Sequence, residues 1–249
     1  MVKANGFKLL AVALLAGVVA CDQATDAKTG TATKASITTT ATPANKDWTT
    51  VVAATPEGGF RMGNPAAPVK LIEYASLTCP HCRDFHETAM TTIKSKYVAT
   101  GRVSYEYRNF VLNGPDYAAS LLARCQGAAP FFNLANAFYQ SQAQWTEPFT
   151  RLTPADNTAM QALPADRQMQ ALALKGGLDG FMRTRGMTRA KFDQCLTDKA
   201  AQDKLNAMRT VAVEKYGLTG TPSFIINEAT QKDISGWAQL EPKLQAALN

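Results

Sequence analysis

The sequence predicts an α/β fold in which a core sheet is interrupted by an α-helical subdomain. Three observations predict this fold. A strand-forming run at residues 69–76 passes directly into a helical pattern. Residues 114–216 are predicted to form several helices, and the apolar run at residues 224–227 then returns the chain to the sheet. A single domain of about 200 residues with a helical insertion accounts for all three.

The individual elements follow from local composition. Alternation of Val103, Tyr105 and Tyr107 predicts a strand between the first helix and the helical segment. The expected strands are, in order, residues 48–54, 69–76, 103–110, 224–227 and 231–235, of which the last two form a hairpin. A final helix is expected at residues 237–248.

Two thiols three positions apart, Cys79 and Cys82, follow the strand at residues 69–76. A pair with this spacing closes a small disulfide ring only where the backbone turns sharply, as it does between a strand and a helix. Four apolar residues then recur on one helix face: Phe85, Ala89, Ile93 and Tyr97. Pro80 fits the first helical position, where its missing N–H costs nothing. Cys79 is therefore expected at the N-terminus of a helix.

The position of Cys79 predicts a reactive thiol. A helix N-terminus stabilises an anion through its unpaired N–H groups and its dipole, so Cys79 should ionise more easily than a free cysteine. His81, inside the motif, can add hydrogen bonds or positive charge to the same sulfur. A stabilised thiolate makes the disulfide a stronger oxidant, by about 30 mV for roughly each 1.4 kcal/mol. Cys82, one turn into the helix, should be less exposed and act as the resolving thiol.

Other kinds of site also use closely spaced cysteines. Zinc could take Cys79, Cys82 and His86, but a closed tetrahedral site needs a fourth ligand, and the chain has no second pair with this spacing. Attachment of c-type haem needs a histidine directly after the second cysteine, where this chain has Arg83. A purely structural disulfide is a further alternative, although so small a ring constrains the unfolded chain little.

A second motif lies far downstream, where residues 217–223 have the sequence Gly-Leu-Thr-Gly-Thr-Pro-Ser. A proline just ahead of a buried strand cannot donate a hydrogen bond to the sheet. A cis Thr221–Pro222 bond is the hypothesis, and because only about 5 to 6% of X-Pro bonds are cis, it depends on the presence of the two-cysteine motif.

Together the two motifs resemble those of the DsbA-like thiol-disulfide oxidoreductases, which have a thioredoxin fold. The likeness rests on residues 71–82 and 220–224 and extends over about residues 47–249. It implies a thioredoxin-like core sheet with the α-helical subdomain inserted at about residues 114–216.

The same resemblance implies roles for individual residues. Cys79 would be the exposed nucleophile and Cys82 its partner. Thr221 and Pro222 would line the groove in which a substrate backbone pairs beside the sulfurs. Glu73, in the strand before the motif, matches the buried acid that related proteins use for proton transfer to and from the second cysteine.

The surroundings of Glu73 leave its role open. A carboxylate inside an apolar strand is unfavourable unless it is paired or neutral. Arg108 is only a candidate for its basic partner. The alternative is a solvated glutamate at the edge of the strand.

The N-terminal residues predict export. Lys3 and Lys8 accompany about twelve apolar residues, too few to span a bilayer of roughly 30 Å, which is typical of an export signal at residues 1–20. Val-Val-Ala before Cys21 resembles a bacterial lipoprotein cleavage box, which implies lipidation of Cys21; ordinary cleavage is the alternative. Residues 21–46, rich in Thr and Ala, predict a disordered tether. We expect the periplasmic side of the bacterial cell envelope, with an inner-membrane anchor or, without lipidation, a soluble periplasmic protein.

The remaining cysteines predict a second disulfide. The chain has five cysteines, an odd number, so in an exported protein whose cysteines pair as disulfides one cysteine is left over. Apart from Cys21 and the active pair, the chain has Cys125 and Cys195, each in a helical pattern. We predict a structural disulfide between these two; two buried free thiols are the alternative.

These features predict a dithiol oxidase that donates the Cys79–Cys82 disulfide to reduced or unfolded exported proteins, without a bound cofactor or metal. The resemblance implies reoxidation by a DsbB-type membrane quinone-linked oxidase. A disulfide reductase or isomerase on the same fold is an alternative, as is a non-catalytic chaperone or binding module. The net charge of +6 falls to about +4 without Lys3 and Lys8, so nucleic acid is not implied as a partner. A monomer is expected.

Overall fold

The computed structural model describes residues 46–249. The predicted export signal at residues 1–20, the predicted lipidation of Cys21, and all of the predicted tether at residues 21–46 except Lys46 lie outside the described residues. Between residues 46 and 249, no helix combines the length and the apolar character needed to cross a membrane.

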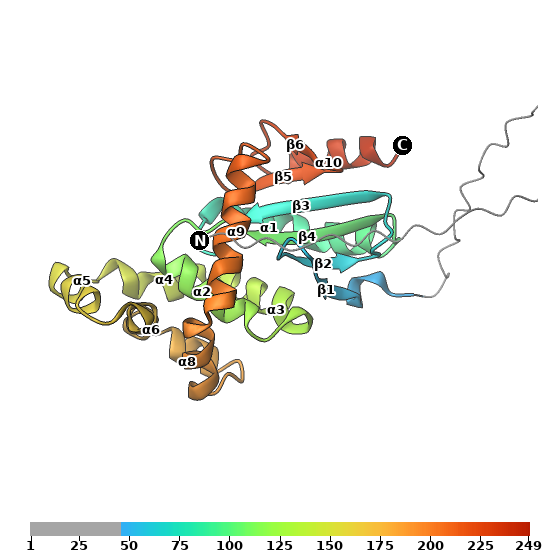
Figure 1. The fold of residues 1–249 in the computed structure, drawn as a ribbon. Helices are drawn as coiled ribbons and strands as arrows, with labels where there is room; N and C mark the ends of the chain where they lie inside the picture. The colour runs from blue at the N-terminus through green and yellow to red at the C-terminus, as the bar shows by residue number, and fades with distance from the viewer. Residues whose placement is uncertain (1–45) are drawn as a thin grey trace, which may run out of the picture. The chain divides into compact units, whose positions relative to one another are not determined.

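A six-stranded mixed sheet forms the centre of the molecule (Figure 1). Its strands are β1 (Val52–Ala54), β2 (Phe60–Gly63), β3 (Val69–Ala75), β4 (Val103–Asn109), β5 (Ser223–Ile226) and β6 (Ala229–Gln231). They lie in the order β1-β2-β4-β3-β5-β6, so β3 is central. β3 is parallel to β4 and antiparallel to β5. The loops that follow β3 and β4 therefore meet at one edge of the sheet.

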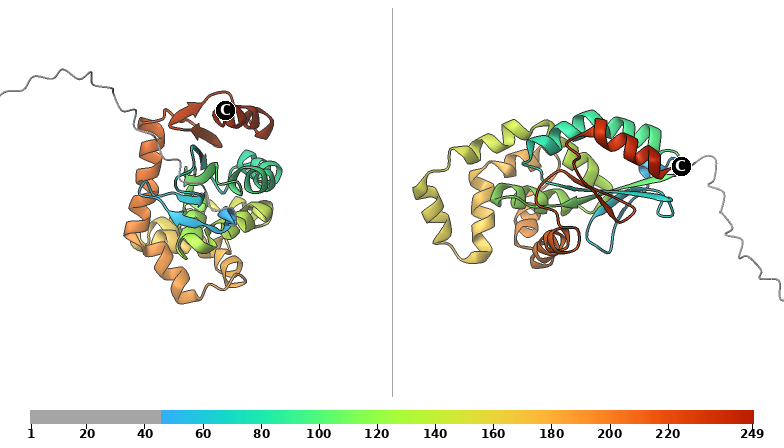
Figure 2. Two further views of the ribbon diagram at one scale, coloured as in Figure 1. Left: turned by 90° about the vertical axis from the view of Figure 1, so that its right-hand side faces the viewer. Right: turned by 90° about the horizontal axis from the view of Figure 1, so that it is seen from above.

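Side chains alternate across the sheet, so each central strand contributes to both faces. Leu71 of β3 lies in the larger apolar core, whereas Ile72 lies in a smaller cluster on the other face together with Ala212. Helices over the larger core include α1 (Pro80–Thr92), α3 (Ala128–Gln140) and α10 (Trp237–Ala247). α9 (Lys199–Glu214), to which Ala212 belongs, crosses the opposite face (Figure 2). The sheet is thus covered by helices on both faces, and the predicted α/β fold is confirmed.

The predicted helix at the two cysteines is present, and it extends beyond its α-helical part. α1 continues into a π-helical segment, Ile93–Val98. The predicted apolar face is buried at all four positions: Phe85, Ala89, Ile93 and Tyr97. This face packs into the larger core and fixes the helix against the sheet.

Helices fill the chain between β4 and β5, as the pattern of residues 114–216 predicts (Figure 1). In addition to α3 and α9 they are α2 (Gly114–Arg124), α4 (Gln142–Thr150), α5 (Pro154–Gln161), α6 (Ala165–Lys175), α7 (Leu178–Arg183) and α8 (Arg189–Thr197). The Asn113 side chain starts α2 by accepting the N–H of Asp116. Cys125, at the end of α2, forms a disulfide with Cys195 of α8, and their Cα atoms are 5.6 Å apart.

The first strands differ from the prediction. Residues 48–50 form a 3-10 turn that the Asp47 side chain caps, and the strand begins only at Val52. β2 was not predicted. β2 pairs with both β1 and β4, and its Phe60 and Met62 are buried. A strand this short has no sequence pattern that would predict the pairing.

The C-terminal hairpin is tighter than predicted. β6 begins at Ala229, two residues earlier than expected, because Asn227 and Glu228 alone form the turn. Their φ angles of 47° and 70° lie in the left-handed region that matches the twist of a two-residue hairpin.

Candidate functional site

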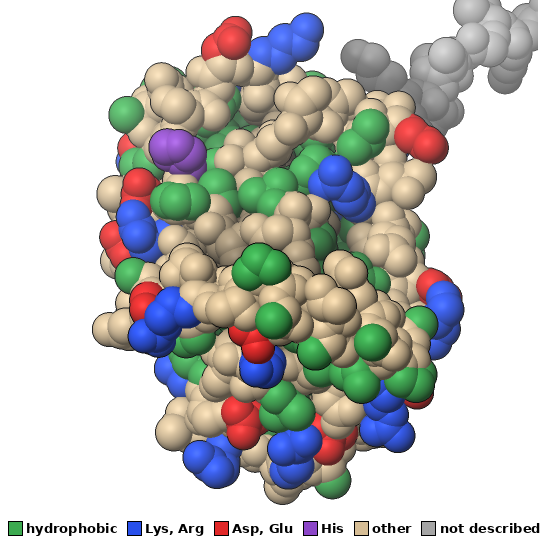
Figure 3. Space-filling model, turned by 90° about the vertical axis from the view of Figure 1, so that its left-hand side faces the viewer, with side chains coloured by type: hydrophobic (Ala, Val, Ile, Leu, Met, Phe, Trp, Pro, Cys, Tyr) green, Lys and Arg blue, Asp and Glu red, His purple; other side chains and the backbone are tan. Residues whose placement is uncertain are grey.

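The two neighbouring cysteines lie where the central strand ends. Cys79 is the N-cap residue of α1, and Pro80 lies in the first helical turn. This end of the sheet faces the viewer in Figure 3, where hydrophobic side chains gather in the middle and charged side chains concentrate over the helical segment below. Both thiols are free, so the structure describes the reduced pair.

The two thiols are unequally accessible, but neither is freely exposed. The relative solvent accessibility is 6% for Cys79 and 0% for Cys82. The expectation of an exposed nucleophile is therefore wrong for the reduced state, because the loop containing Thr221 lies against the sulfur. Cys79 Sγ lies 3.3 Å from the Thr221 carbonyl oxygen, to which the protonated thiol donates a hydrogen bond. Of the two cysteines, only Cys79 keeps some solvent-accessible surface, so it is the one that another thiol can attack.

The surroundings of Cys79 favour its thiolate. A hydrogen bond with the Cys82 thiol is the largest cause that lowers the pKa of Cys79, which falls to about 5 despite burial. The Thr221 side chain and the backbone N–H groups of Cys82 and His81 lower this pKa further. Thr221 Oγ1 is buried and has no other hydrogen-bond partner in the described chain, so its hydroxyl is free to donate to the thiolate.

Cys82 has the opposite tendency. Burial is the main cause that raises its pKa, and the hydrogen bond with Cys79 and the charge of Glu73 raise it further. At neutral pH the reduced pair therefore consists of a thiolate at Cys79 and a thiol at Cys82.

His81 contributes less than its ring chemistry suggests. Its side chain is exposed, and its imidazole makes no hydrogen bond to Cys79. The contribution to the low pKa of Cys79 comes from the His81 backbone N–H, which belongs to the first turn of α1.

Glu73 is buried beneath the two cysteines. It has 0% exposure, which excludes the solvated glutamate considered as an alternative. Its Oε2 accepts a hydrogen bond from the Tyr105 hydroxyl and lies 3.2 Å from His86 Nε2. Its Oε1 has no hydrogen-bond partner among residues 46–249. The His86 ring packs against that of Tyr139, with 4.3 Å between the centroids.

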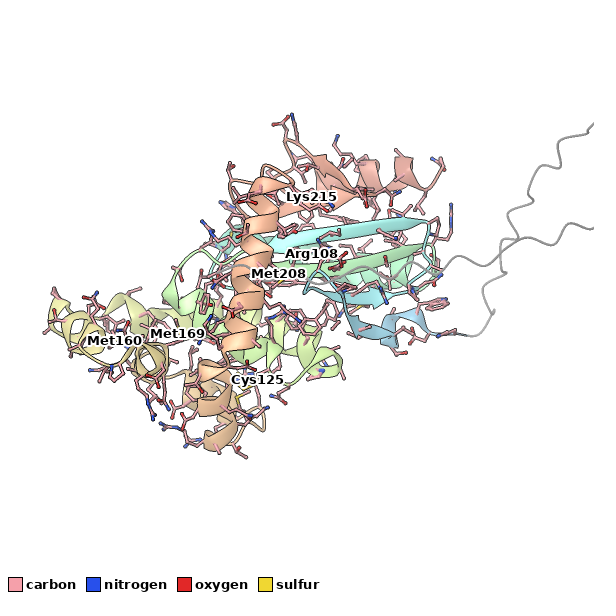
Figure 4. The ribbon with its side chains drawn as sticks, viewed as in Figure 1. Arg108, Cys125, Met160, Met169, Met208 and Lys215 are labelled. Atoms are coloured by element: carbon pink, nitrogen blue, oxygen red, sulfur yellow. A yellow bond between two sulfur atoms is a disulfide. The ribbon has the colours of Figure 1, made fainter. Side chains whose placement is uncertain are left out.

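Arg108 is not the partner of Glu73. The register pairs Glu73 with Tyr107 and Tyr74 with Arg108, so Arg108 points to the other face of the sheet. There it donates to Glu106 at 2.7 Å and to the Tyr74 hydroxyl, on the face that α9 crosses (Figure 4).

The sequence did not identify His86 as the partner of Glu73. His86 was considered only as a zinc ligand, and no group of side chains suited to a metal ion occurs within residues 46–249. The available signal was its spacing: His86 lies four positions after Cys82 and therefore on the same side of α1.

The predicted cis bond is present between Thr221 and Pro222. The loop leads into β5, which pairs with β3, so the proline lies beside the end of the strand that precedes the cysteines. A groove of about 470 Å³ adjoins Pro222 and Ser223 and is bounded on its far side by residues 231–235. Cys79 does not line this groove; the nearest link is Thr221, the neighbour of Pro222, whose carbonyl oxygen lies 3.3 Å from Cys79 Sγ.

Comparison with known proteins places this geometry in a family. A family model described as Thioredoxin matches residues 55–246. A solved structure described as a protein-disulfide isomerase from Novosphingobium aromaticivorans is 36% identical, with a TM-score of 0.72, and the match covers 76% of this chain and 96% of that one. Alpha-DsbA1 from Wolbachia pipientis is 26% identical, with a TM-score of 0.62 over 79% of this chain and 93% of its own.

Curated relatives agree with these matches. A Rickettsia typhi protein, whose name proposes that it is a protein-disulfide oxidoreductase, is 27% identical over 175 residues, which is 70% of this chain and 56% of the relative. The chain thus spans little more than half the length of this relative.

Proposed function

We propose, from the premise that this chain belongs to the thioredoxin-fold family of DsbA-like thiol-disulfide oxidoreductases, that it donates its Cys79–Cys82 disulfide to other proteins. The unequal acidity of the two thiols carries this proposal. A pKa of about 5 at Cys79 stabilises the reduced state of the pair relative to the disulfide. The disulfide is then a strong oxidant.

The first exchange step uses the accessible sulfur. A substrate thiolate attacks Cys79 Sγ, a substrate–Cys79 disulfide forms, and the Cys79–Cys82 bond breaks. Cys82 leaves as a thiolate and takes up a proton, because burial raises its pKa. Glu73, Tyr105 and His86 form the polar cluster from which we propose that this proton comes.

The second step releases the product. The second thiolate of the substrate attacks the substrate sulfur of the mixed disulfide, and Cys79 leaves as a thiolate. Because a low pKa makes a good leaving group, the same environment that stabilises the Cys79 thiolate speeds this step. The two electrons end on the cysteine pair, and no cofactor takes part.

The groove beside Pro222 is the proposed substrate site. An extended segment can align with the loop before β5 through backbone hydrogen bonds and so bring its cysteine to Cys79. Pro222 has no N–H to satisfy, and Thr221 is directly in contact with the reactive sulfur. Recognition of this kind accepts many sequences in an unfolded protein.

The cellular setting of the proposal rests on the N-terminal sequence. Residues 1–20 predict export, and Cys21 with residues 21–46 predicts a lipid anchor and a tether at the periplasmic side of the inner membrane. The substrates would be newly exported reduced proteins, and the recycling partner a DsbB-type quinone-linked oxidase. The protein would act as a monomer.

An isomerase is the second candidate, because the relative that is 36% identical is described as a protein-disulfide isomerase. The reduction potential of the Cys79–Cys82 pair, measured by equilibration with glutathione, separates the two. We expect a value near the oxidising end, roughly −120 mV; roughly −180 mV would favour the isomerase, and roughly −270 mV would contradict the oxidase. A variant with Cys125→Ala and Cys195→Ala restricts the measurement to one pair.

A further inference from the structure

The short segment between β3 and Cys79 is held by side chains of the helical subdomain. The N–H of Leu77 donates to Asp116 Oδ1 of α2 at 2.9 Å. The hydroxyl of Tyr139, in α3, donates to the Ser76 carbonyl oxygen at 3.2 Å. The chain entering the redox motif is therefore fixed by helices that come later in the sequence.

Gln142 makes the contact nearest to the reactive sulfur. It is the first residue of α4 and is only 4% exposed. Its Nε2 donates to the Leu77 carbonyl oxygen at 2.8 Å and to the Cys79 carbonyl oxygen at 3.0 Å. One side-chain amide thus holds the backbone on both sides of Thr78.

The geometry points to Gln142 as a positioning residue that sets the direction of the Cys79 sulfur. The Cys79 N–H is held by the Ser76 carbonyl at 3.2 Å, and its C=O accepts hydrogen bonds from both the Gln142 amide and the Arg83 N–H. With both flanking peptide planes fixed, the Cys79 side chain keeps a single freedom, rotation about its Cα–Cβ bond. The sulfur then meets the first N–H groups of α1 and Thr221 together.

The chemistry of the amide explains why the position is specific. The backbone carbonyls of Leu77 and Cys79 are both turned toward the Gln142 Nε2 donor. An apolar side chain there would leave the Leu77 carbonyl without this partner and leave the Cys79 carbonyl held only by the Arg83 N–H at 3.2 Å, so the backbone on both sides of Thr78 would be less restrained. A carboxylate would repel both carbonyl oxygens and add a negative charge near the thiolate. Either change should make the Cys79 thiolate less favourable.

The inference rests on the proposed redox function, and the full chain tests both. In Gln142→Met the pKa of Cys79, followed by the ultraviolet absorbance of the thiolate, should rise by about one unit. The glutathione equilibrium should shift about tenfold toward the disulfide, equivalent to about 30 mV. Gln142→Glu should shift both quantities further and serves if the Met variant does not fold.

A matched variant separates positioning from stability. Trp145→Phe changes a residue of the same helix with the same 4% exposure, and removes a hydrogen bond from Nε1 to the Phe138 carbonyl oxygen at 2.8 Å. It should lower the melting temperature and leave the Cys79 titration unchanged. Gln142 variants that lose stability but titrate like the wild type would overturn the inference. A wild-type Cys79 that stays protonated at neutral pH would instead overturn the proposed function.

Discussion

The molecule contains two cysteine pairs that differ in almost every physical respect. Cys79 and Cys82 lie one helical turn apart at the N-terminus of α1 and are free thiols. Cys125 and Cys195 are separated by 70 positions and are joined by a disulfide that links the end of α2 to α8. A disulfide between Cys79 and Cys82 would enclose only a very short loop, whereas the Cys125–Cys195 disulfide encloses a loop that contains most of the helical subdomain.

The difference shows what a reversible disulfide requires. At Cys79 and Cys82 the environment separates the two reduced thiols, lowering the pKa of one to about 5 and raising that of the other. The low pKa of Cys79 stabilises the reduced state relative to the disulfide, so the pair tends to pass its disulfide on to the thiols of another protein. At Cys125 and Cys195 the consequence of the bond is a shorter unfolded loop, which stabilises the fold. Cys79 and Cys82 therefore form a chemical pair, and Cys125 and Cys195 form a structural pair.

The largest effect is expected from the chemical pair. Cys79→Ser should abolish disulfide transfer to a reduced model peptide, because the accessible sulfur is lost. Cys82→Ala retains Cys79, whose thiolate should attack the disulfide of an oxidised peptide, expel one peptide thiolate and stay joined to the other peptide sulfur, because no Cys82 is present to resolve the mixed disulfide, which non-reducing electrophoresis detects. Cys125→Ser, with the chemical pair intact, is the matched control and should transfer disulfides at near wild-type rate. Equal loss in the Cys125 variant would break the comparison.

Removal of the structural pair should change stability instead. For a closed loop of 70 residues, the chain-entropy model gives a loss of about 4 kcal/mol in the free energy of unfolding for Cys125→Ala with Cys195→Ala. Urea unfolding of the oxidised protein measures this loss. Transfer activity at low temperature should persist; a variant that keeps its stability but loses transfer would contradict the assignment.

The smallest effect is a dependence on pH that only the chemical pair should show. The pKa of Cys79 is about 5 in the folded reduced protein and roughly 8.5 in an unfolded chain. Because the folded pKa is the lower one, its stabilising contribution is complete above roughly pH 8.5 and is lost as the pH falls through about 5. The free energy of unfolding of the reduced protein, relative to that of the oxidised protein, should therefore increase as the pH is raised from about 5 to roughly 8.5.

Urea midpoints of both redox states, in the background without Cys125 and Cys195, check this slope. Burial raises the pKa of Asp116 to about 6, but this group is present in both states and cancels in the difference. Cys79→Ala forms no disulfide, and its urea midpoint should vary with pH as that of the oxidised protein does, without the added rise of the reduced protein. A flat difference between the two redox states would show that the Cys79 thiolate is not stabilised by folding.

The sequence by itself determined the features that depend on neighbours along the chain. Strand and helix periodicities located β3, β4, α1 and the helical segment, since a repeat of two or about four residues is visible locally. The spacing of Cys79 and Cys82 and the place of Pro80 fixed the motif at a helix N-terminus. The likeness of both motifs to one family indicated the cis Thr221–Pro222 bond, which the structure contains.

Tertiary structure alone decided which side chains meet across those elements. The sequence offered Arg108 as the partner of Glu73, but the strand register puts the two on opposite faces and brings His86 to the acid. It gave no sign that Gln142 reaches the carbonyl of Cys79, 63 positions earlier. Such contacts depend on register and helix packing, and the free energies that fix these come from burial summed over many distant residues rather than from any local pattern.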